Sequence, residues 1–272
     1  MKIADWLDKT RRAFDAADIA TARLDAEVLL SFALGVNRAW LIAHGDDELT
    51  EKQLKEVGEL VKRRLNREPI AHLLGHKEFY GRDFMVTKDT LVPRPESETL
   101  IDISKELFSD NGSLRAIDVG TGSGCLGITL KCEIPQLQMT LSDVSPEALA
   151  VAKQNAIKIS VDVTFSQRDL LSAFTDTNAN SFDFIVANLP YVDASWEGLS
   201  PELDHEPAMA LFADDEGLLL IKKLIDQAPK VLNKNGCLLL EADPVQHPAI
   251  VNYAKLFDAI KTRDYAVVLR LK

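Results

Sequence analysis

The spacing of apolar residues divides the chain into a helical first quarter and a longer region in which strands and helices alternate. Near the N-terminus, apolar positions such as Leu24 and Val28 recur at the intervals typical of amphipathic helices. Thr50 and Gln53 predict a capping box at the start of a further helix. This pattern predicts a small helical domain over residues 1–68.

Residues 69–97 predict a connector rather than part of either region. Pro69 ends the helical pattern, and residues 79–86 have the pattern of a short hairpin. The prolines within Leu91–Glu96 fix the backbone of a stiff, extended segment, because proline restricts both itself and the residue before it.

Residues 98–272 predict an α/β domain. A helix is predicted over residues 98–108, and another begins near Ser145, where Pro146 occupies a tolerated first-turn position. Strands are predicted at residues 115–119, 138–143, 163–167, 182–187 and 236–241, followed by a terminal antiparallel pair at 257–262 and 265–271. Alternation of this kind is typical of a mostly parallel sheet covered by helices on both faces.

A glycine-rich turn, Gly120-Thr121-Gly122-Ser123-Gly124, lies between a predicted strand and a predicted helix. Glycines in this place let a ligand approach the backbone closely. Asp143 follows about 20 positions later, the spacing expected of a carboxylate that binds ribose hydroxyls. Asp143 also suits the N-terminal boundary of the helix near Ser145. The match of Gly122 to Gly127 with G-x-G-x-x-G fits nicotinamide enzymes as well as methyltransferases.

A second candidate site is Asn188-Leu189-Pro190-Tyr191, directly after the apolar strand at residues 182–187. Residues just past the carboxyl ends of parallel strands line the ligand crevice of open α/β sheets. A carboxamide and a backbone carbonyl can accept the hydrogens of a planar amide or amino group, and an aromatic ring can stack on its face. The two signals together predict a nucleoside site beside a site that holds an amide.

Composition and charge narrow the class of protein. No apolar run approaches the roughly 20 residues of a membrane span, and the N-terminus lacks the pattern of a secretory signal. Three cysteines without metal-like spacing predict a reducing, cytoplasmic setting. Residues 1–90 hold 15 Lys+Arg and 16 Asp+Glu, so residues 91–272 hold 16 and 26, a net charge of −10. This excess of acid disfavours stable nucleic-acid binding.

Three further clusters have more than one interpretation. The basic residues Lys62, Arg63, Arg64 and Arg67 suit either a solvated helix face or contact with an acidic partner. His72 and His76 have i, i+4 spacing, but no partner set completes a metal site, and none is predicted. His205 and Glu206 resemble an acid–base pair, although a structural loop explains them as well.

With these residues assembled, the chain resembles the HemK/PrmC family of protein-(glutamine-N5) methyltransferases that act on peptide chain release factors. The resemblance is carried by Glu68 to Gly75, by Leu91-Val92-Pro93-Arg94-Pro95-Glu96-Ser97-Glu98, by Asp118 to Gly124, by Asn188 to Tyr191, and by Glu206-Pro207 with Glu216-Gly217-Leu218. Two departures stand out. Leu189 replaces the proline usual in the family, and the segment before the last strand lacks its usual glycine.

The resemblance implies a class I methyltransferase (Rossmann-like) fold with a mostly parallel seven-stranded sheet. It implies S-adenosylmethionine as cofactor and the glutamine of a Gly-Gly-Gln motif in release factors as substrate. It implies substrate recognition by residues 1–68, a linker over 69–97, a catalytic domain over 98–272, and a monomer. It implies that cofactor is bound by Asp118, Gly120, Thr121, Gly122, Ser123, Gly124, Asp143, Asp169, Leu170 and Asn188, and glutamine by Asn188, Leu189, Pro190 and Tyr191.

In this picture Asn188 and the Leu189 carbonyl accept the two amide hydrogens, Tyr191 packs on the amide plane, and no metal is required. Asp169 suits a contact with the adenine amino group, or an ordinary polar strand end. Three other functions stay open. They are an N6-adenine methyltransferase acting on nucleic acid, a nicotinamide oxidoreductase, and a catalytically inactive cofactor-binding scaffold.

Overall fold

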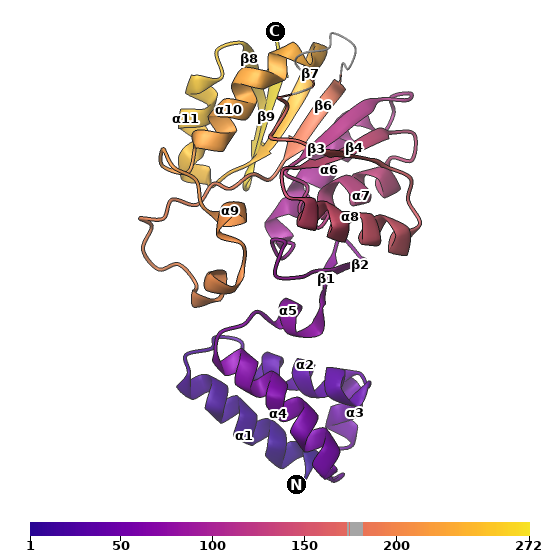
Figure 1. Cartoon of the computed structure of the whole chain (residues 1–272), viewed down its shortest axis with the longest axis vertical. Helices are drawn as coiled ribbons and strands as arrows, with labels where there is room; N and C mark the ends of the chain where they lie inside the picture. The colour runs from indigo at the N-terminus through magenta and orange to yellow at the C-terminus, as the bar shows by residue number, and fades with distance from the viewer. Residues whose placement is uncertain (173, 175–181) are drawn as a thin grey trace. The chain divides into compact units, whose positions relative to one another are not determined.

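The computed structural model describes residues 1–172, 174 and 182–272, which form two compact units (Figure 1). The first unit holds residues 1–75 together with 200–205, and the second holds 76–199 and 206–272. The chain therefore passes between the units three times. The predicted helical domain ended at residue 68, but the first unit continues through α5 (Ile70–Leu74), which packs on α2 and α4.

The first unit is a helical bundle whose apolar faces meet in one core. Its helices are α1 (Ile3–Ala16), α2 (Ala22–Leu34), α3 (Arg38–Ala43), α4 (Glu51–Leu65), α5, and a 3-10 turn, η2 (Pro201–His205). The predicted capping box is confirmed, since the Thr50 side chain accepts from the Gln53 backbone and the Gln53 side chain caps Thr50. Phe14, Leu29 and Leu30 are fully buried at the centre of the core.

A buried arginine organises this unit. Arg64 is only 5% exposed, and its Nε donates to Asp25 Oδ2 at 2.7 Å. Its Nη2 donates to Glu202 Oε1 at 2.9 Å, across 138 positions of sequence, and Arg67 also pairs with Glu202. Burial raises the pKa of Glu202, but hydrogen bonds from Ser200 and Arg64 outweigh that effect and lower the pKa to about 2. Two residues of the basic cluster, Arg64 and Arg67, therefore contact an acidic residue of the same chain. Lys62, in the same cluster, stays exposed.

We expect Arg64→Ala to lower the free energy of unfolding by about 3–5 kcal/mol, because it leaves the Asp25 carboxylate buried and unpaired. Thermal and urea unfolding of the variant measure this loss. Lys62→Ala on the same helix removes an exposed charge and is expected to change stability by no more than about 0.5 kcal/mol. Equal effects of the two substitutions would contradict a structural role for the buried arginine.

The second unit is built on a seven-stranded sheet, as predicted. Its strands are β3 (Arg115–Val119), β4 (Gln138–Asp143), β5 (Thr164–Gln167), β6 (Phe182–Ala187), β7 (Leu232–Glu241), β8 (Phe257–Arg263) and β9 (Ala266–Leu271). The order is β5-β4-β3-β6-β7-β9-β8. All neighbours are parallel except the β7–β9 and β8–β9 pairs, so the predicted terminal antiparallel pair is confirmed. A separate hairpin joins β1 (His76–Phe79) to β2 (Arg82–Met85).

Helices cover both faces of the sheet (Figure 1). On one face lie α6 (Glu98–Phe108), α7 (Cys125–Glu133) and α8 (Pro146–Ile159), and on the other lie α10 (Leu219–Gln227) and α11 (His247–Tyr253). Short elements complete the unit: α9 (Ala208–Leu211), η1 (Pro95–Ser97), η3 (Ala228–Lys230) and η4 (Pro244–Gln246). Successive strand residues alternate between the two cores, since Ile117 and Ile185 face α10 while Ala116 and Phe184 face α6 and α7.

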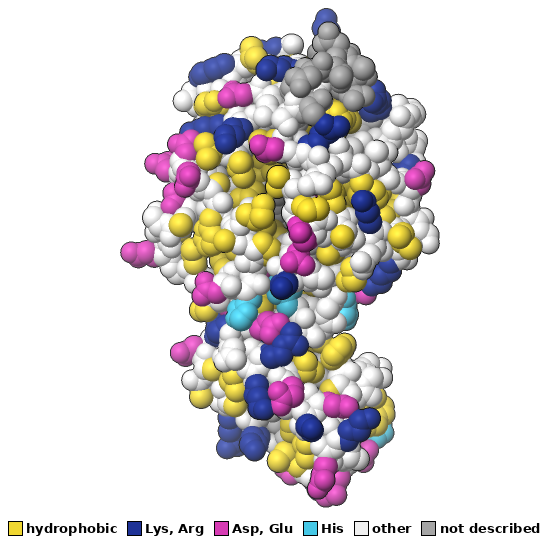
Figure 2. Space-filling view, in the orientation of Figure 1, with side chains coloured by type: hydrophobic (Ala, Val, Ile, Leu, Met, Phe, Trp, Pro, Cys, Tyr) yellow, Lys and Arg dark blue, Asp and Glu magenta, His cyan; other side chains and the backbone are white. Residues whose placement is uncertain are grey.

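The strand order places a crevice at the middle of the sheet. From β3 the chain adds β4 and β5 on one side, and it then returns to add β6 on the other. The connections after β3 and β6 therefore diverge, and ligands bind at such a switch point outside the carboxyl ends of the strands. Figure 2 shows apolar side chains gathered over the middle of this unit, with acidic side chains among them. No helix in the described part of the chain is long and apolar enough to cross a membrane.

Candidate active site

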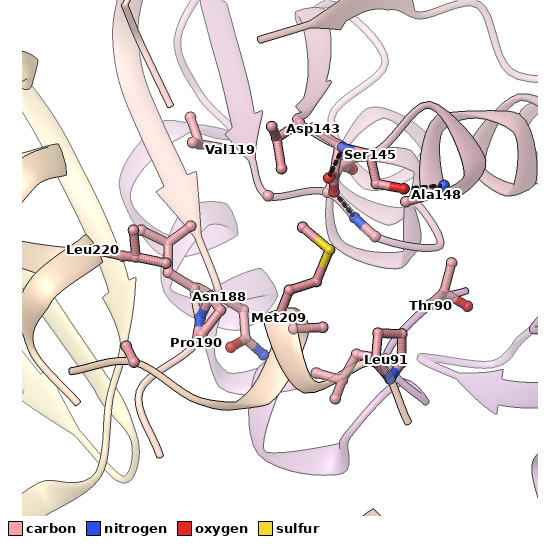
Figure 3. Close-up of a pocket in the computed structure, with 18 of the residues that line it drawn as sticks. Thr90, Leu91, Val119, Asp143, Ser145, Ala148, Asn188, Pro190, Met209 and Leu220 are labelled. Carbon is pink, nitrogen blue, oxygen red and sulfur yellow. Dashed lines mark hydrogen bonds between the residues drawn. The ribbon is translucent and has the colours of Figure 1, made fainter. Parts of the chain in front are cut away.

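A cavity of about 590 Å³ lies at the carboxyl ends of β3, β4, β5 and β6 (Figure 3). Most of the predicted site residues line it: Gly120, Thr121, Gly122, Ser123, Asp143, Asp169, Leu170, Asn188, Leu189 and Pro190. Four segments that are far apart in sequence therefore meet at one place, as the parallel sheet requires.

Asp118 supports the glycine-rich turn from behind and does not line the cavity. Its side chain is fully buried, and Oδ2 accepts from Thr121 Oγ1 at 2.6 Å and from the Gly127 backbone at 2.9 Å. Burial raises the pKa of Asp118 to about 7. Gly124 does not line the cavity either. It packs so closely that a Cβ at this position would lie 2.8 Å from Ile128 Cδ1. Both residues shape the turn, and neither is among the residues that line the cavity.

Asp143 marks the start of α8 and also lines the cavity. Its Oδ2 accepts from the Gly122 backbone at 2.9 Å, and its Oδ1 accepts from the Ser145 backbone at 2.9 Å. The carboxylate thus joins the glycine-rich turn to the start of α8 while it stands on the cavity wall (Figure 3). Burial raises its pKa. An ionised carboxylate has about four acceptor positions, so it can still accept hydrogens from a ligand.

Asn188 presents its carboxamide to the cavity from the end of β6 (Figure 3). Its Nδ2 donates to Ser97 Oγ at 3.0 Å. One of the two amide hydrogens is thereby used, and the amide oxygen remains able to accept from a ligand. Beside it, the Leu189 side chain is buried, and its Cδ2 would stand 2.9 Å from a Cβ at position 120. Leucine in place of proline therefore packs directly over Gly120.

Tyr191 is held behind the cavity rather than on its wall. Its hydroxyl donates to Glu241 Oε1 at 3.2 Å, and its carbonyl accepts from Gln246 Nε2 at 2.9 Å. Burial and the neighbouring Glu241 raise the pKa of the phenol. Gly217 lies against the same carbonyl, with φ of +78° and no space for a side chain. Sequence reasoning missed Glu241 and Gln246, whose signal is limited to polar residues near the end of an apolar strand.

The segment after the 3-10 turn η2 closes another side of the cavity. Glu206 is buried, its Oε2 accepts from the Val92 backbone at 2.8 Å, and its Oε1 accepts from Arg94. Met209, from α9, extends between Asn188 and the Asp143–Ser145 turn (Figure 3). His205 belongs to the other unit, where its Nε2 contacts the Asn66 carbonyl at 2.7 Å. His205 and Glu206 therefore do not form an acid–base pair.

The charges of the wall favour a cation. The acids on it outnumber the bases; the acids are Asp89, Asp143, Asp169, Asp193, Asp214 and Asp215, and the bases are Arg94 and Arg168. Such a lining attracts a positively charged ligand and repels a phosphate backbone. Cys125 also lines the cavity, but burial raises its pKa to about 12, which disfavours a thiolate nucleophile. No group of metal-binding side chains occurs among the described residues, and His72 and His76 lie on α5 and β1.

The sheet order, the glycine-rich turn after β3, the acid after β4 and the Asn-x-Pro-Tyr segment after β6 define a class I methyltransferase. A solved methyltransferase from Pyrococcus furiosus has the same fold, with a TM-score of 0.52 at 18% identity over 78% of this chain and 98% of its own. Residues 5–75 match the PrmC N-terminal domain, and residues 97–200 match the methyltransferase small domain.

Relatives that match most of the chain identify the family. The chain is 39% identical to the release factor glutamine methyltransferase of Koribacter versatilis, over 90% of this chain and 89% of that protein. It is 34% identical to the enzyme of the same name from Deinococcus radiodurans, over 92% and 89%. The chain belongs to the family of release factor glutamine methyltransferases, as its motifs predicted.

Proposed function

We propose that this chain transfers a methyl group from S-adenosylmethionine to the side-chain amide nitrogen, N5, of the glutamine in the Gly-Gly-Gln motif of peptide chain release factors. The observation that carries this proposal is Asn188, which lines the cavity and whose amide nitrogen donates to Ser97, so that its amide oxygen can accept from a ligand. An acceptor in that place suits a substrate that offers N–H groups.

The cavity fits the cofactor in shape and charge. The backbone at Gly122 is open, since a Cβ there would meet nothing within 4 Å. Asp143 would bind the ribose, and Asp169 and Leu170 would contact the adenine. When bound, S-adenosylmethionine supplies an electrophilic methyl group and a neutral sulfur leaving group. The acidic wall would stabilise its sulfonium charge.

The chain's contribution to the transfer is to orient a weak nucleophile. An amide nitrogen reacts poorly because its lone pair is delocalised into the carbonyl. Asn188 Oδ1 and the Leu189 carbonyl would accept its two hydrogens and fix the nitrogen in line with the methyl group. Positioning of this kind can supply several kcal/mol, with roughly 7–11 as the ceiling. Tyr191 would support this segment from behind, and the methylated amide would lose its proton to water.

Selection of one protein among many requires contacts beyond a single glutamine. We propose that the helical unit recognises the body of the release factor and that the enzyme acts as a monomer in the cytoplasm. We also propose that it binds no nucleic acid stably, because the cavity wall is acidic.

Mass spectrometry tests the proposed function directly. The chain and labelled cofactor are incubated with one substrate at a time. The substrates are a release factor, the same factor with alanine in place of the target glutamine, and adenine-containing DNA or RNA. A single methyl group on the glutamine, absent from the alanine form, is the expected result. Label on nucleic acid alone would favour an N6-adenine enzyme, and cofactor binding without transfer to any substrate would favour an inactive scaffold.

Asp143→Ala is expected to raise the dissociation constant of S-adenosylmethionine about tenfold or more, because hydrogen bonds to charged groups contribute roughly 1.5–3 kcal/mol. Isothermal titration calorimetry measures this constant. Asp143→Asn retains one side-chain oxygen for the backbone of the turn, and we expect it to bind more tightly than the alanine variant. An unchanged dissociation constant in the alanine variant would remove Asp143 from the cofactor site.

A further inference from the structure

A buried acid stands directly behind the segment that would hold the substrate amide. Glu241, the last residue of β7, is 1% exposed, and its Oε1 accepts from the Tyr191 hydroxyl. Its Oε2 is also buried and has no hydrogen-bond partner among the residues that the structure describes. A buried carboxylate oxygen without a partner is costly to the fold, so Glu241 requires an explanation beyond packing.

The neighbours of Glu241 include Asn188 and the serine that holds its side chain. Burial raises the pKa of Glu241, and the nearby donor groups of Ser97, Tyr191 and Asn188 oppose that rise. Ser97 Oγ itself accepts from Asn188 Nδ2 at 3.0 Å. A serine hydroxyl has one proton to donate, and in this bond with Asn188 that proton is not used. The unpartnered Oε2 of Glu241 is an acceptor available for it.

The direction of these bonds decides which end of the Asn188 carboxamide faces the cavity. If Ser97 donates its proton to Glu241, it can only accept from Asn188, and the amide oxygen of Asn188 points to the substrate. If the acceptor at position 241 is lost, Ser97 can donate to Asn188 instead. The carboxamide then turns over and presents its N–H groups to the substrate nitrogen, which also carries hydrogens.

We propose that Glu241 is a positioning residue, which receives the Ser97 proton and so keeps the oxygen of Asn188 toward the substrate amide. This inference rests on the proposed function. Glu241 touches neither substrate nor cofactor; it acts through Ser97 and Asn188. The role goes beyond shape, because an uncharged residue of the same size at position 241 would fill the space without fixing the direction of the bonds.

The test compares Glu241→Gln with wild type on the release factor. Glutamine has almost the same volume, but it can donate to Ser97 and reverse the bonds. We expect kcat to fall about 100-fold, the effect of a misplaced reacting group, while the cofactor dissociation constant and the melting temperature change little. Ser97→Ala breaks the same link and should lose activity similarly. Tyr191→Phe removes only the Oε1 contact and leaves the Ser97 link in place, so it should cost about tenfold in kcat, the low end of the roughly 1.5–3 kcal/mol that a hydrogen bond to a charged group contributes.

Substrate selectivity separates positioning from a merely structural role. A release factor with glutamate in place of the target glutamine presents a carboxylate, which the Asn188 oxygen repels in the wild type. A turned carboxamide would donate to that carboxylate. We therefore expect Glu241→Gln to reduce the preference for glutamine over glutamate in binding by about tenfold, the value of one hydrogen bond.

The pH profile provides a second such readout. Burial raises the pKa of Glu241 to about 7, so the charged acceptor predominates above that pH. We expect kcat of the wild type to rise with pH through this range and the rise to be absent in Glu241→Gln. The other titratable groups around this carboxylate are Glu96 of η1, Tyr191 after β6, Cys125 of α7 and, beyond Tyr191, Tyr265 of the β8–β9 turn. These four groups are the same in the wild type and in Glu241→Gln, so a difference between the two pH profiles reports on position 241.

Glu133→Gln is the matched control, because Glu133 is a partly buried acid of the same unit that pairs with Lys105 and Arg82 away from the cavity. It should keep kcat within about twofold of the wild type. Wild-type kcat, selectivity and pH profile in Glu241→Gln would overturn the inference and leave the proposed function intact. Failure of the wild type to methylate the release factor would overturn both.

Discussion

Replacement of Asn188 by alanine is expected to reduce kcat by about 100- to 1,000-fold, the range found when a precisely placed polar group of an active site is removed. The alanine variant lacks the amide oxygen, so one N–H of the substrate loses its acceptor and the nitrogen is free to turn away from the methyl group. Single-turnover transfer to the release factor measures the chemical step directly.

Cofactor binding and stability should be nearly unaffected by the same change. Calorimetry with S-adenosylmethionine is expected to give a dissociation constant within about threefold of the wild type, since a peripheral contact contributes no more than about 0.6 kcal/mol. Asn252→Ala, an exposed asparagine on α11, is the matched control and should keep full activity. Wild-type turnover in Asn188→Ala would contradict the proposed positioning of the substrate amide.

Gly217→Ala is expected to destabilise the second unit more than the addition of a methyl group at any other glycine of that unit. A Cβ at this position would lie 2.0 Å from the Tyr191 carbonyl oxygen and 2.7 Å from Gln246 Nε2. The carbonyl belongs to the backbone and cannot rotate away, so the whole Asn188–Tyr191 segment must move. We expect a loss of about 3 kcal/mol or more in the free energy of unfolding and, in the protein that remains folded, about 100-fold lower kcat.

Gly198→Ala separates steric clash from backbone strain. Gly198 has φ of +75°, close to the +78° of Gly217, but a Cβ there would meet nothing within 4 Å. Only the conformational penalty of about 1–2 kcal/mol applies to it. Urea unfolding and transfer assays of both variants provide the comparison. Similar losses in the two would show that the contact with Tyr191 is unimportant.

Most of the sheet was predictable because most of its strands are rich in apolar residues and are bounded by turn residues. β6 is the clearest case, since Phe182–Ala187 is followed directly by Asn188. The same property hides which side a strand residue faces, because both faces are buried. Asp118, which the resemblance implied as a cofactor residue, has its side chain against Thr121 and Gly127, a contact that the strand pattern did not indicate.

The rest of the site depends on contacts between distant parts of the sequence, which local patterns do not encode. Glu206 meets Val92 across 114 positions, and both lie in irregular segments. Glu241 appears in the sequence only as a polar end to an apolar strand. Its relation to Asn188 follows from the parallel neighbours β6 and β7, whose register no short motif specifies.

The arginine pair on Glu202 limits how this chain can be dissected. A truncated protein that began at His76 would retain residues 200–205 but lack Arg64 and Arg67, the side chains that hold them. A few residues further on, that orphaned stretch becomes the α9 portion of the cavity wall. Removing the helices would therefore free the segment that leads into the cavity wall, as well as delete the unit that we propose recognises the release factor. Weak turnover by the shortened enzyme would then not measure recognition alone.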